Sequence, residues 1–301
     1  MHETVLLHEA VDALLGDDDQ RLHGSYADGT FGRGGHSAEI LKRLSEHGRL
    51  IATDKDPQAI ATGKEFEQQD SRFAIVQGSF ADLKNFIADK NIASLDGILL
   101  DLGVSSPQLD QAERGFSFMR DGYLDMRMNP DAGQSAAEWI AEAKVPEIRK
   151  VLKEFGDERY ALRIAEAIVA ERDKNPITTT LHLQKVVAEA HPAWERGKNP
   201  ATKAFQGIRI FINNELGDLE DLLNQALDLL SIGGRLVVIS FHSLEDRMVK
   251  RFIKQQVRGD VLPAGVAILD SQLNKRMKGS AEVEGNVRSR SAIMRVAEKI
   301  A

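Results

Sequence analysis

One glycine-rich stretch near the start of the chain decides the fold: Tyr26-Ala27-Asp28-Gly29-Thr30-Phe31-Gly32-Arg33-Gly34-Gly35-His36-Ser37. Four of the seven residues from 29 to 35 are glycine. Glycine permits positive φ angles and a close approach of the backbone to another group. Asp54 follows twenty positions after Gly34, at the end of the next apolar run. A glycine turn followed by such an acidic residue is typical of a nucleoside site, where the acidic side chain accepts hydrogen bonds from a ribose.

Apolar runs alternate with helical patterns over the first hundred residues. The runs at 25–28, 49–54, 73–76 and 95–101 are predicted strands. Runs that are apolar on both faces and separated by helices indicate a buried parallel sheet. Three of these runs end in aspartate, at Asp28, Asp54 and Asp101. Because the carboxyl ends of parallel strands meet at one edge, we expect the three carboxylates to lie along that edge.

The pattern becomes mostly helical after Asp101 and returns to strands near the C-terminus. A helical stripe of leucines over 216–230 is expected to end at Gly233-Gly234, before a fifth strand at 235–240 and an edge strand at 291–296. We therefore predict an α/β fold with a Rossmann-like sheet, interrupted after strand four. The sheet domain would be discontinuous, over 1–108 and 210–301, and the helical insert would span 109–209.

Composition limits the classes of protein to which the chain can belong. Its 301 residues contain no cysteine, which excludes disulfides and thiolate chemistry and agrees with a reducing cytosol. No apolar run reaches membrane-spanning length, and residues 1–9 carry acidic groups where a signal peptide carries basic ones. We expect a cytoplasmic protein with no membrane partner. The net charge of −7 argues against a non-specific nucleic-acid binder but permits a local basic face.

The acidic strand ends favour one class of cofactor. The loop lacks the G-x-G-x-x-G spacing of nicotinamide sites, and three carboxylates would be poor neighbours for a pyrophosphate. S-adenosyl-L-methionine carries an amino group, a carboxylate and a sulfonium, and no phosphate. We expect Asp28 beside its cationic amino-acid part, Asp54 at the ribose and Asp101 near the methyl group. Taken singly, each aspartate could instead only cap the loop or helix that follows its strand. Phe80, after strand three, is either a cover for the adenine ring or a core aromatic residue.

Other chemistries have weaker sequence support. His242, in Ser240-Phe241-His242-Ser243-Leu244-Glu245-Asp246, could belong to a hydrolase triad, but the chain has no G-x-S-x-G elbow. It also has no H-E-x-x-H motif, no Walker A loop and no zinc-deaminase signature. We therefore expect no metal site.

A series of motifs resembles the ribosomal RNA small subunit methyltransferase H family over nearly the whole chain. In order, the motifs are the loop at 28–37, Asp101-Leu102-Gly103-Val104-Ser105-Ser106-Pro107-Gln108-Leu109-Asp110, Arg114-Gly115-Phe116-Ser117-Phe118, Leu124-Asp125-Met126-Arg127-Met128, Phe205-Gln206 with Arg209, Asn213 and Glu215, and 240–247. The resemblance implies a class I methyltransferase that modifies the N4 amino group of a cytidine in the decoding region of bacterial 16S rRNA, within the small ribosomal subunit. It implies cofactor contacts at Gly34, Gly35, His36, Asp54, Phe80, Asp101 and Gln108.

The catalytic residue is less well defined. Many amino methyltransferases use an Asn/Asp-Pro-Pro-aromatic motif after strand four, whereas this chain has Asp101-Leu102-Gly103-Val104. Asp101 is the first candidate to hold the amino hydrogens, and Ser105 and His242 are weaker ones that could equally structure their loops. The insert, with Arg114, Arg120 and Arg127, is expected either to form a wall of the RNA site or to pack as a cap on the sheet.

Two other functions stay open at this stage. One is a nicotinamide-dependent oxidoreductase on a similar fold, and the other is a non-catalytic ribosome-binding module. The sequence leaves open whether the chain forms a homodimer, and it assigns no RNA contact in 261–285.

Overall fold

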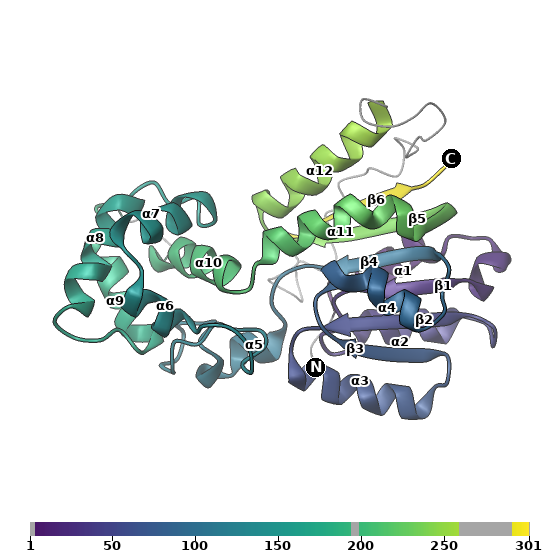
Figure 1. Ribbon diagram of the computed structural model, residues 1–301, viewed down its shortest axis with the longest axis horizontal. Coiled ribbons are helices and arrows are strands. Elements are labelled where there is room, and N and C mark those ends of the chain that lie inside the picture. Colours follow the sequence, from purple (N-terminus) through teal and green to yellow (C-terminus); the bar gives the residue numbers. More distant parts are fainter. Residues whose placement is uncertain (1–3, 194–198, 259–290, 301) are drawn as a thin grey trace. The chain divides into compact units, whose positions relative to one another are not determined.

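The chain forms two compact units in the computed structural model, which describes residues 4–193, 199–258 and 291–300 (Figure 1). The first, here called the sheet unit, comprises Met1–Gly103 and Leu216–Ala301. The second, here called the helical unit, comprises Val104–Glu215. The sequence had placed these boundaries at 108/109 and 209/210. The stretch 261–285 lies outside the described residues.

The sheet unit is built on a mostly parallel sheet. Within the described residues the strand order is β3-β2-β1-β4-β5-β6, with β6 antiparallel to β5 and the other neighbours parallel. The strands are β1 (Ser25–Asp28), β2 (Arg49–Asp54), β3 (Phe73–Gln77), β4 (Leu95–Asp101), β5 (Leu230–Ser240) and β6 (Ile293–Glu298). Asp28 pairs with Ala52 on one side and Leu99 on the other, so the predicted acidic edge is present.

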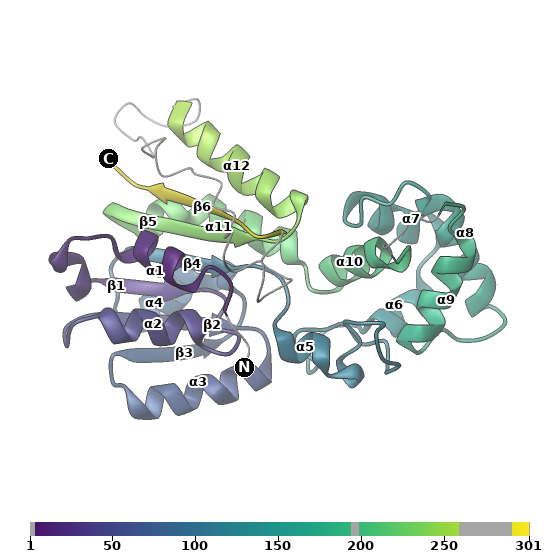
Figure 2. The ribbon, with the colours of Figure 1, turned by 180° about the vertical axis from the view of Figure 1, so that it is seen from behind.

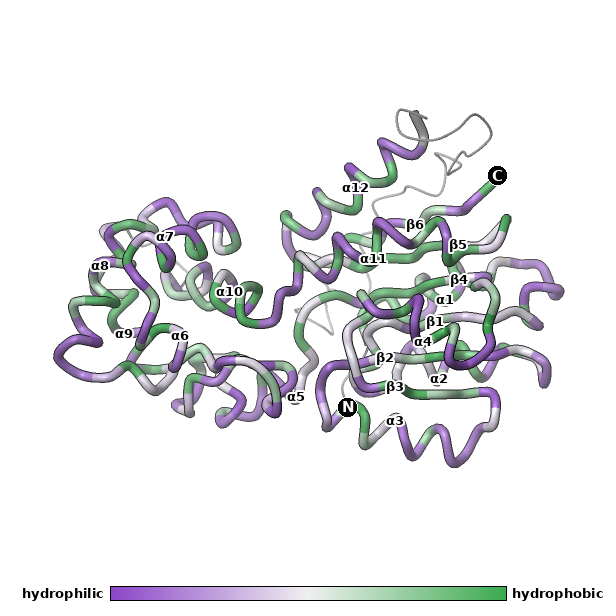
Figure 3. Tube along the Cα trace, viewed as in Figure 1, coloured by the Kyte–Doolittle hydropathy of each residue, from purple (hydrophilic) through white to green (hydrophobic). Residues whose placement is uncertain are grey.

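Helices cover both faces of this sheet (Figures 1 and 2). Neighbouring residues of one strand point to opposite faces: Leu99 packs in one core cluster, and Ile98 and Leu100 in the other. The first cluster includes residues of α1 (Leu7–Leu15), α2 (Gly35–Arg43) and α3 (Pro57–Gln69). The second includes residues of α4 (Leu83–Asp89), α11 (Glu215–Leu229) and α12 (Ser243–Arg258). Hydrophobic and hydrophilic residues alternate along α12 (Figure 3), as expected of a helix with one face on the sheet.

The prediction for the region around Gly233-Gly234 was wrong in one respect. Helix α11 already ends at Leu229, and both glycines lie inside β5. The Gly233 N–H donates to the Lys299 carbonyl, and the Lys299 N–H donates to the Gly234 carbonyl. The glycines are therefore held by backbone pairing with the chain after β6, and Gly233 adopts a φ of 80° there.

The helical unit has its own apolar core. Its elements are α5 (Ser106–Asp110), η3 (Ala112–Arg114), α6 (Ala136–Glu142), α7 (Val145–Glu154), α8 (Ala161–Arg172), α9 (Thr180–Ala190) and α10 (Ala201–Ile212). Buried residues of α6 to α10 form one cluster together with Leu124 and Met126. Ser135 caps α6, because its hydroxyl accepts the Glu138 N–H while the Glu138 carboxylate accepts the Ser135 N–H at 2.8 Å. None of the helices described is both long enough and apolar enough to span a bilayer.

Candidate functional site

The glycine loop joins β1 to α2 at the carboxyl edge of the sheet. Gly34 is the N-cap of α2 and has a φ of 77°, in the left-handed region that favours glycine. A Cβ at Gly34 would lie 2.8 Å from the Phe31 ring, and one at Gly35 would collide with the Thr4 side chain. These two glycines therefore permit close packing against the protein itself. A Cβ at Gly32 would meet only the Thr30 carbonyl oxygen, at an ordinary contact distance of 3.9 Å.

Asp54 lies at the end of β2 and contacts this loop. One carboxylate oxygen accepts the Gly32 N–H at 2.8 Å, and the other accepts the Asp56 N–H at 2.9 Å. A carboxylate can accept about four hydrogen bonds, so each oxygen can also accept one from a ribose hydroxyl. The pKa of Asp54 is raised to about 6: burial is the largest cause, the two N–H donors lower it, and the nearby carboxylates of Asp56 and Asp28 add to the rise.

Asp28 is hydrogen-bonded to the glycine loop and to α2. Its side chain is only 1% exposed. The carboxylate accepts the Thr30 N–H at 3.1 Å and the Ser37 hydroxyl at 2.7 Å. Burial raises its pKa to about 6. The carboxylate is enclosed and holds the loop against the first turn of α2, as in the capping alternative, and a contact with a cationic ligand stays a prediction.

His36 and Asp101 form a pair at the centre of the edge. The His36 Nδ1 lies 3.8 Å from a carboxylate oxygen of Asp101, at the end of β4. Burial lowers the pKa of His36 to about 4, so the imidazole is neutral at pH 7. The His36 Nε2 is buried and has no hydrogen-bond partner within the described residues. A buried, unpartnered ring nitrogen is costly, and a polar ligand at this edge would satisfy it.

Phe80 lies in η2 (Phe80–Asp82), directly after β3. The N–H of Ala81 donates to the Ser79 hydroxyl at 3.1 Å, which caps this turn. A Cβ at Gly29 would lie 2.9 Å from the Phe80 Cβ, so the aromatic side chain packs on the glycine loop. Phe80 also packs at the margin of the second core cluster, and is half-buried. An aromatic ring at this position is suited to contact a nucleobase.

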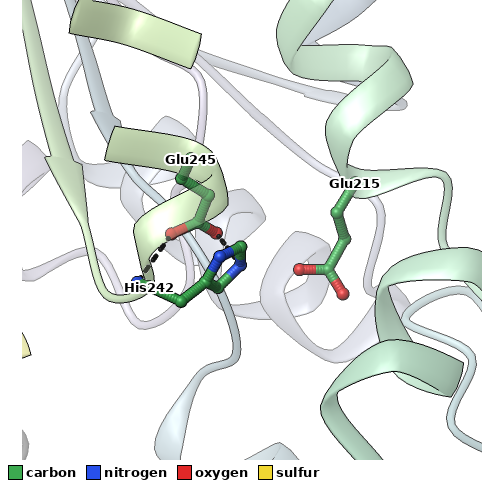
Figure 4. Close-up of side chains that lie close together, drawn as sticks. All are labelled: Glu215, His242 and Glu245. Atoms are coloured by element: carbon green, nitrogen blue, oxygen red, sulfur yellow. Dashed lines mark hydrogen bonds and ion pairs between the residues drawn. The ribbon is translucent and has the colours of Figure 1, made fainter. Parts of the chain in front are cut away.

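His242 follows β5 and lies beside Glu245 of α12. The imidazole and the carboxylate face each other (Figure 4), with His242 Nε2 2.9 Å from a Glu245 oxygen. The other Glu245 oxygen accepts the N–H of Phe241 at 2.9 Å and that of His242 at 3.3 Å. Glu245 is 2% exposed. The carboxylate therefore fixes the turn through the two backbone N–H groups and lies beside the imidazole, at the end of the strand next to β4.

The remaining predicted residues lie in the helical unit. Ser105 and Gln108 form the capping box of α5, in which the Ser105 N–H donates to the Gln108 side-chain oxygen at 2.9 Å. Arg114 is buried and donates to the carbonyl oxygens of Arg127 and Met128. Arg127 is paired with Asp125. Of the three arginines expected in an RNA wall, two therefore stabilise the unit itself, and Arg120 is exposed.

Sequence reasoning did not identify one cluster at the sheet edge. Ser79 donates a hydrogen bond to Asp218 of α11, and the Lys55 ammonium lies 2.5 Å from the same carboxylate oxygen. Lys55 follows Asp54, and Ser79 precedes Phe80. No motif spacing connects these positions, because Asp218 is 139 residues from Ser79.

The edge fits S-adenosyl-L-methionine. Asp54 offers acceptors for a ribose diol, Phe80 offers an aromatic face, and His36 offers an unpartnered nitrogen. Together with the strand order and the antiparallel last strand, this acidic edge defines a Rossmann-like class I methyltransferase that depends on S-adenosyl-L-methionine.

Comparison with known proteins identifies the family. The chain belongs to the MraW methylase family, whose model matches residues 1–300. It is 55% identical to the ribosomal RNA small subunit methyltransferase H of Marinomonas sp. (strain MWYL1), over 99% of this chain and 97% of that protein. Among solved structures it is similar to an rRNA methylase from Streptococcus thermophilus, with 11% identity, a TM-score of 0.43, and 100% and 99% of the two chains covered. Another is an S-adenosylmethionine-dependent O-methyltransferase from Thermotoga maritima, with 9% identity, a TM-score of 0.41, and 100% and 68% covered.

Proposed function

We propose that the protein transfers a methyl group from S-adenosyl-L-methionine to the N4 amino group of a cytidine in the decoding region of bacterial 16S rRNA. Membership of the MraW methylase family supports methyl transfer. The 55% identical relative, which carries the name of a small-subunit rRNA methyltransferase, supports the substrate. The protein would act in the cytoplasm, on rRNA within the small ribosomal subunit.

The observation that carries the cofactor role is the position of the Asp54 carboxylate, which closes the glycine loop through Gly32 and keeps acceptors for a ribose. Phe80 would lie against the adenine. His36 would hold a polar group of the cofactor through Nε2, and Asp101 would lie near the methyl group. Gly34 and Gly35 would shape the loop backbone, and Gln108 would contribute from the helical unit.

The proposed reaction requires activation of a poor nucleophile, because the lone pair of an exocyclic amino group is delocalised into the cytosine ring. The bound cofactor supplies a methyl group already activated by its sulfonium. As the N–CH₃ bond forms and the C–S bond breaks with its electron pair going to sulfur, the nitrogen must lose a proton. Asp101 would accept a hydrogen bond from the amino group and hold the nitrogen in line, since correct positioning supplies much of the rate.

His242 and Ser105 are the alternative proton acceptors. His242 has the stronger support, because its imidazole lies at the end of the strand next to β4, with Nε2 2.9 Å from a Glu245 carboxylate oxygen. The helical unit would bind the folded RNA, with Arg120 as an exposed basic residue. The cytidine must leave its stack to reach the edge of the sheet.

The decisive experiment is mass mapping of modified nucleosides. Small subunits from cells that lack the enzyme are incubated with the purified protein and S-adenosyl-L-methionine. The proposal requires one new N4-methylcytidine in the decoding region. Methylation at another base would overturn the substrate assignment, and subunit binding without methyl incorporation would favour a non-catalytic module. In a separate binding test with labelled S-adenosyl-L-methionine and NAD, retention of NAD and not of the methyl donor by the protein would favour an oxidoreductase.

A further inference from the structure

The carboxylate of Asp218 connects two chain segments that both belong to the cofactor edge. One is the segment after β2, through the Lys55 ammonium at 2.5 Å. The other is the segment after β3, through the hydroxyl of Ser79. Asp54 immediately precedes Lys55, and Phe80 immediately follows Ser79. One side chain on α11 therefore holds the neighbours of both residues expected to contact the nucleoside.

The contact with Ser79 continues into the turn that carries Phe80. The Ser79 hydroxyl donates to Asp218 and accepts the Ala81 N–H at 3.1 Å. The first residue of the turn is Phe80. The position of the aromatic side chain is thus set by a hydrogen-bond chain that begins at the carboxylate.

A second residue of α11 holds the same turn. The Gln225 amide donates to the Ala81 carbonyl at 2.6 Å, and its oxygen accepts the Lys84 N–H at 3.3 Å. Gln225 lies seven residues after Asp218, which places both side chains on one face of the helix. Both Asp218 and Gln225 of α11 therefore hydrogen-bond to the segment after β3. Of these two residues, Asp218 also contacts the segment after β2, through Lys55.

Burial makes the Asp218 contacts energetically important. The residue is 7% exposed, and the Lys55 side chain is 24% exposed. A largely buried carboxylate is tolerated when it has hydrogen-bonding and charged partners. Loss of the charge would remove the attraction that draws the two segments together.

We propose that Asp218 is a positioning residue for the nucleoside half of the cofactor site, acting through Lys55 and Ser79 on the segments that carry Asp54 and Phe80. The inference rests on the proposed function, because it takes the ligand to be an adenosyl cofactor. It extends that function to a residue of α11. It predicts that a substitution of Asp218 weakens the binding of the adenosine part of the ligand and leaves the binding of the amino-acid part unchanged.

The test uses the full chain and two ligands. Isothermal titration compares S-adenosylhomocysteine with 5′-methylthioadenosine, which lacks the amino-acid part, in the wild type and in Asp218→Asn. Thermal unfolding is measured in parallel. Asp221→Asn is the matched control, because it is the same change at an exposed position of α11. We expect Asp218→Asn to raise the dissociation constants of both ligands by the same factor, about tenfold, and Asp221→Asn to change neither.

Each outcome separates the inference from the function on which it rests. If the wild type binds neither ligand, the proposed function fails. If the wild type binds and Asp218→Asn binds equally well, only the inference fails. Weaker binding of S-adenosylhomocysteine alone, or no wild-type affinity for 5′-methylthioadenosine, also overturns it. If Asp218→Asn does not fold, Lys55→Gln must show the same parallel loss, and unchanged affinities in that variant would overturn the inference.

Discussion

The backbone N–H of Gly32 donates to the carboxylate of Asp54 at 2.8 Å, so the side chain expected to bind the ribose also holds the glycine loop in place. A side chain would have room at Gly32, whereas Gly34 and Gly35 pack closely on the protein. If Asp54 binds the ribose as proposed, the order of the loop and the binding of the cofactor are coupled through one carboxylate. A change at Asp54 should affect both.

Asp54→Ala should weaken cofactor binding strongly and leave RNA binding nearly unchanged. The variant loses the acceptor for the ribose and for two backbone N–H groups. Hydrogen bonds to a charged group contribute about 1.5–3 kcal/mol each, so we expect the dissociation constant for S-adenosyl-L-methionine to rise by about a hundredfold. Titration calorimetry measures the cofactor, and filter binding measures the RNA. Equal losses of both affinities would indicate a folding defect instead.

Cofactor affinity should fall in acid because the pKa of Asp54 is raised to about 6. The ionised carboxylate accepts ribose hydrogen bonds more strongly than the neutral acid does. Affinity should be constant above about pH 7 and should decrease as the pH falls through the pKa. Asp54→Asn, which does not titrate, should bind weakly with a flatter profile over the same range. A wild-type profile as flat as that of the variant would contradict the prediction.

The sequence predicted the parts of this site that depend on local pattern. Strands ending in Asp28, Asp54 and Asp101 are visible as apolar runs, and parallel pairing brings their ends together. It could not predict that the Asp28 carboxylate is enclosed, because that depends on where Ser37 lies after the turn. The sequence also could not predict that Arg114 is buried within the helical unit, because its partners are backbone carbonyl oxygens, which no residue pattern reveals.

Long-range packing explains the other differences. Asp218 reaches the edge because α11 packs in the second core cluster and its carboxylate meets Ser79, and a contact between distant positions leaves no spacing in the sequence. The glycines at 233 and 234 resemble a helix end, but pairing with the chain after β6 places them in a strand. In both cases a tertiary contact decides the structure. For Asp218 the sequence carries no local signal, and for the two glycines the tertiary contact overrides the local signal.

Stability should depend on pH through His36. Burial lowers its pKa from 6.5 to about 4. Between these values the unfolded chain binds more protons, so the contribution of His36 to stability decreases as the pH falls. We expect a loss of about 2 kcal/mol between about pH 7.5 and about pH 5.

The variant His36→Gln is needed to isolate this effect, because Asp28 and Asp54 change the stability in the opposite direction over the same pH range. Their pKa values are raised when folded, so their contributions rise as the pH falls through about 6. The difference in unfolding free energy between wild type and His36→Gln, measured in urea at both pH values, cancels the shared groups. A difference that does not change with pH would show that the imidazole titrates normally.

Ser37→Ala should destabilise the fold through Asp28. The Ser37 hydroxyl donates to the enclosed carboxylate at 2.7 Å. Removing that donor leaves a buried acceptor with fewer partners, which costs about 1–3 kcal/mol. The pKa of Asp28 should rise further, because the hydroxyl favours the ionised form. Denaturant unfolding measures the loss. Ser71→Ala, the same change at an exposed position of the sheet unit, is the control and should change stability less.

Glu245 offers a way to separate the role of His242 from that of Asp101. Its carboxylate accepts the Phe241 and His242 N–H groups and lies 2.9 Å from His242 Nε2. A glutamine can keep one acceptor for the backbone but presents amide hydrogens or a neutral oxygen to the imidazole. If His242 takes the proton, Glu245→Gln should slow methyl transfer by about tenfold and leave cofactor affinity unchanged. His242→Ala should then add little to the effect of Glu245→Gln, since both changes disable one unit. Full activity of His242→Ala would exclude the imidazole as the proton acceptor and leave Asp101 and Ser105 as the candidates.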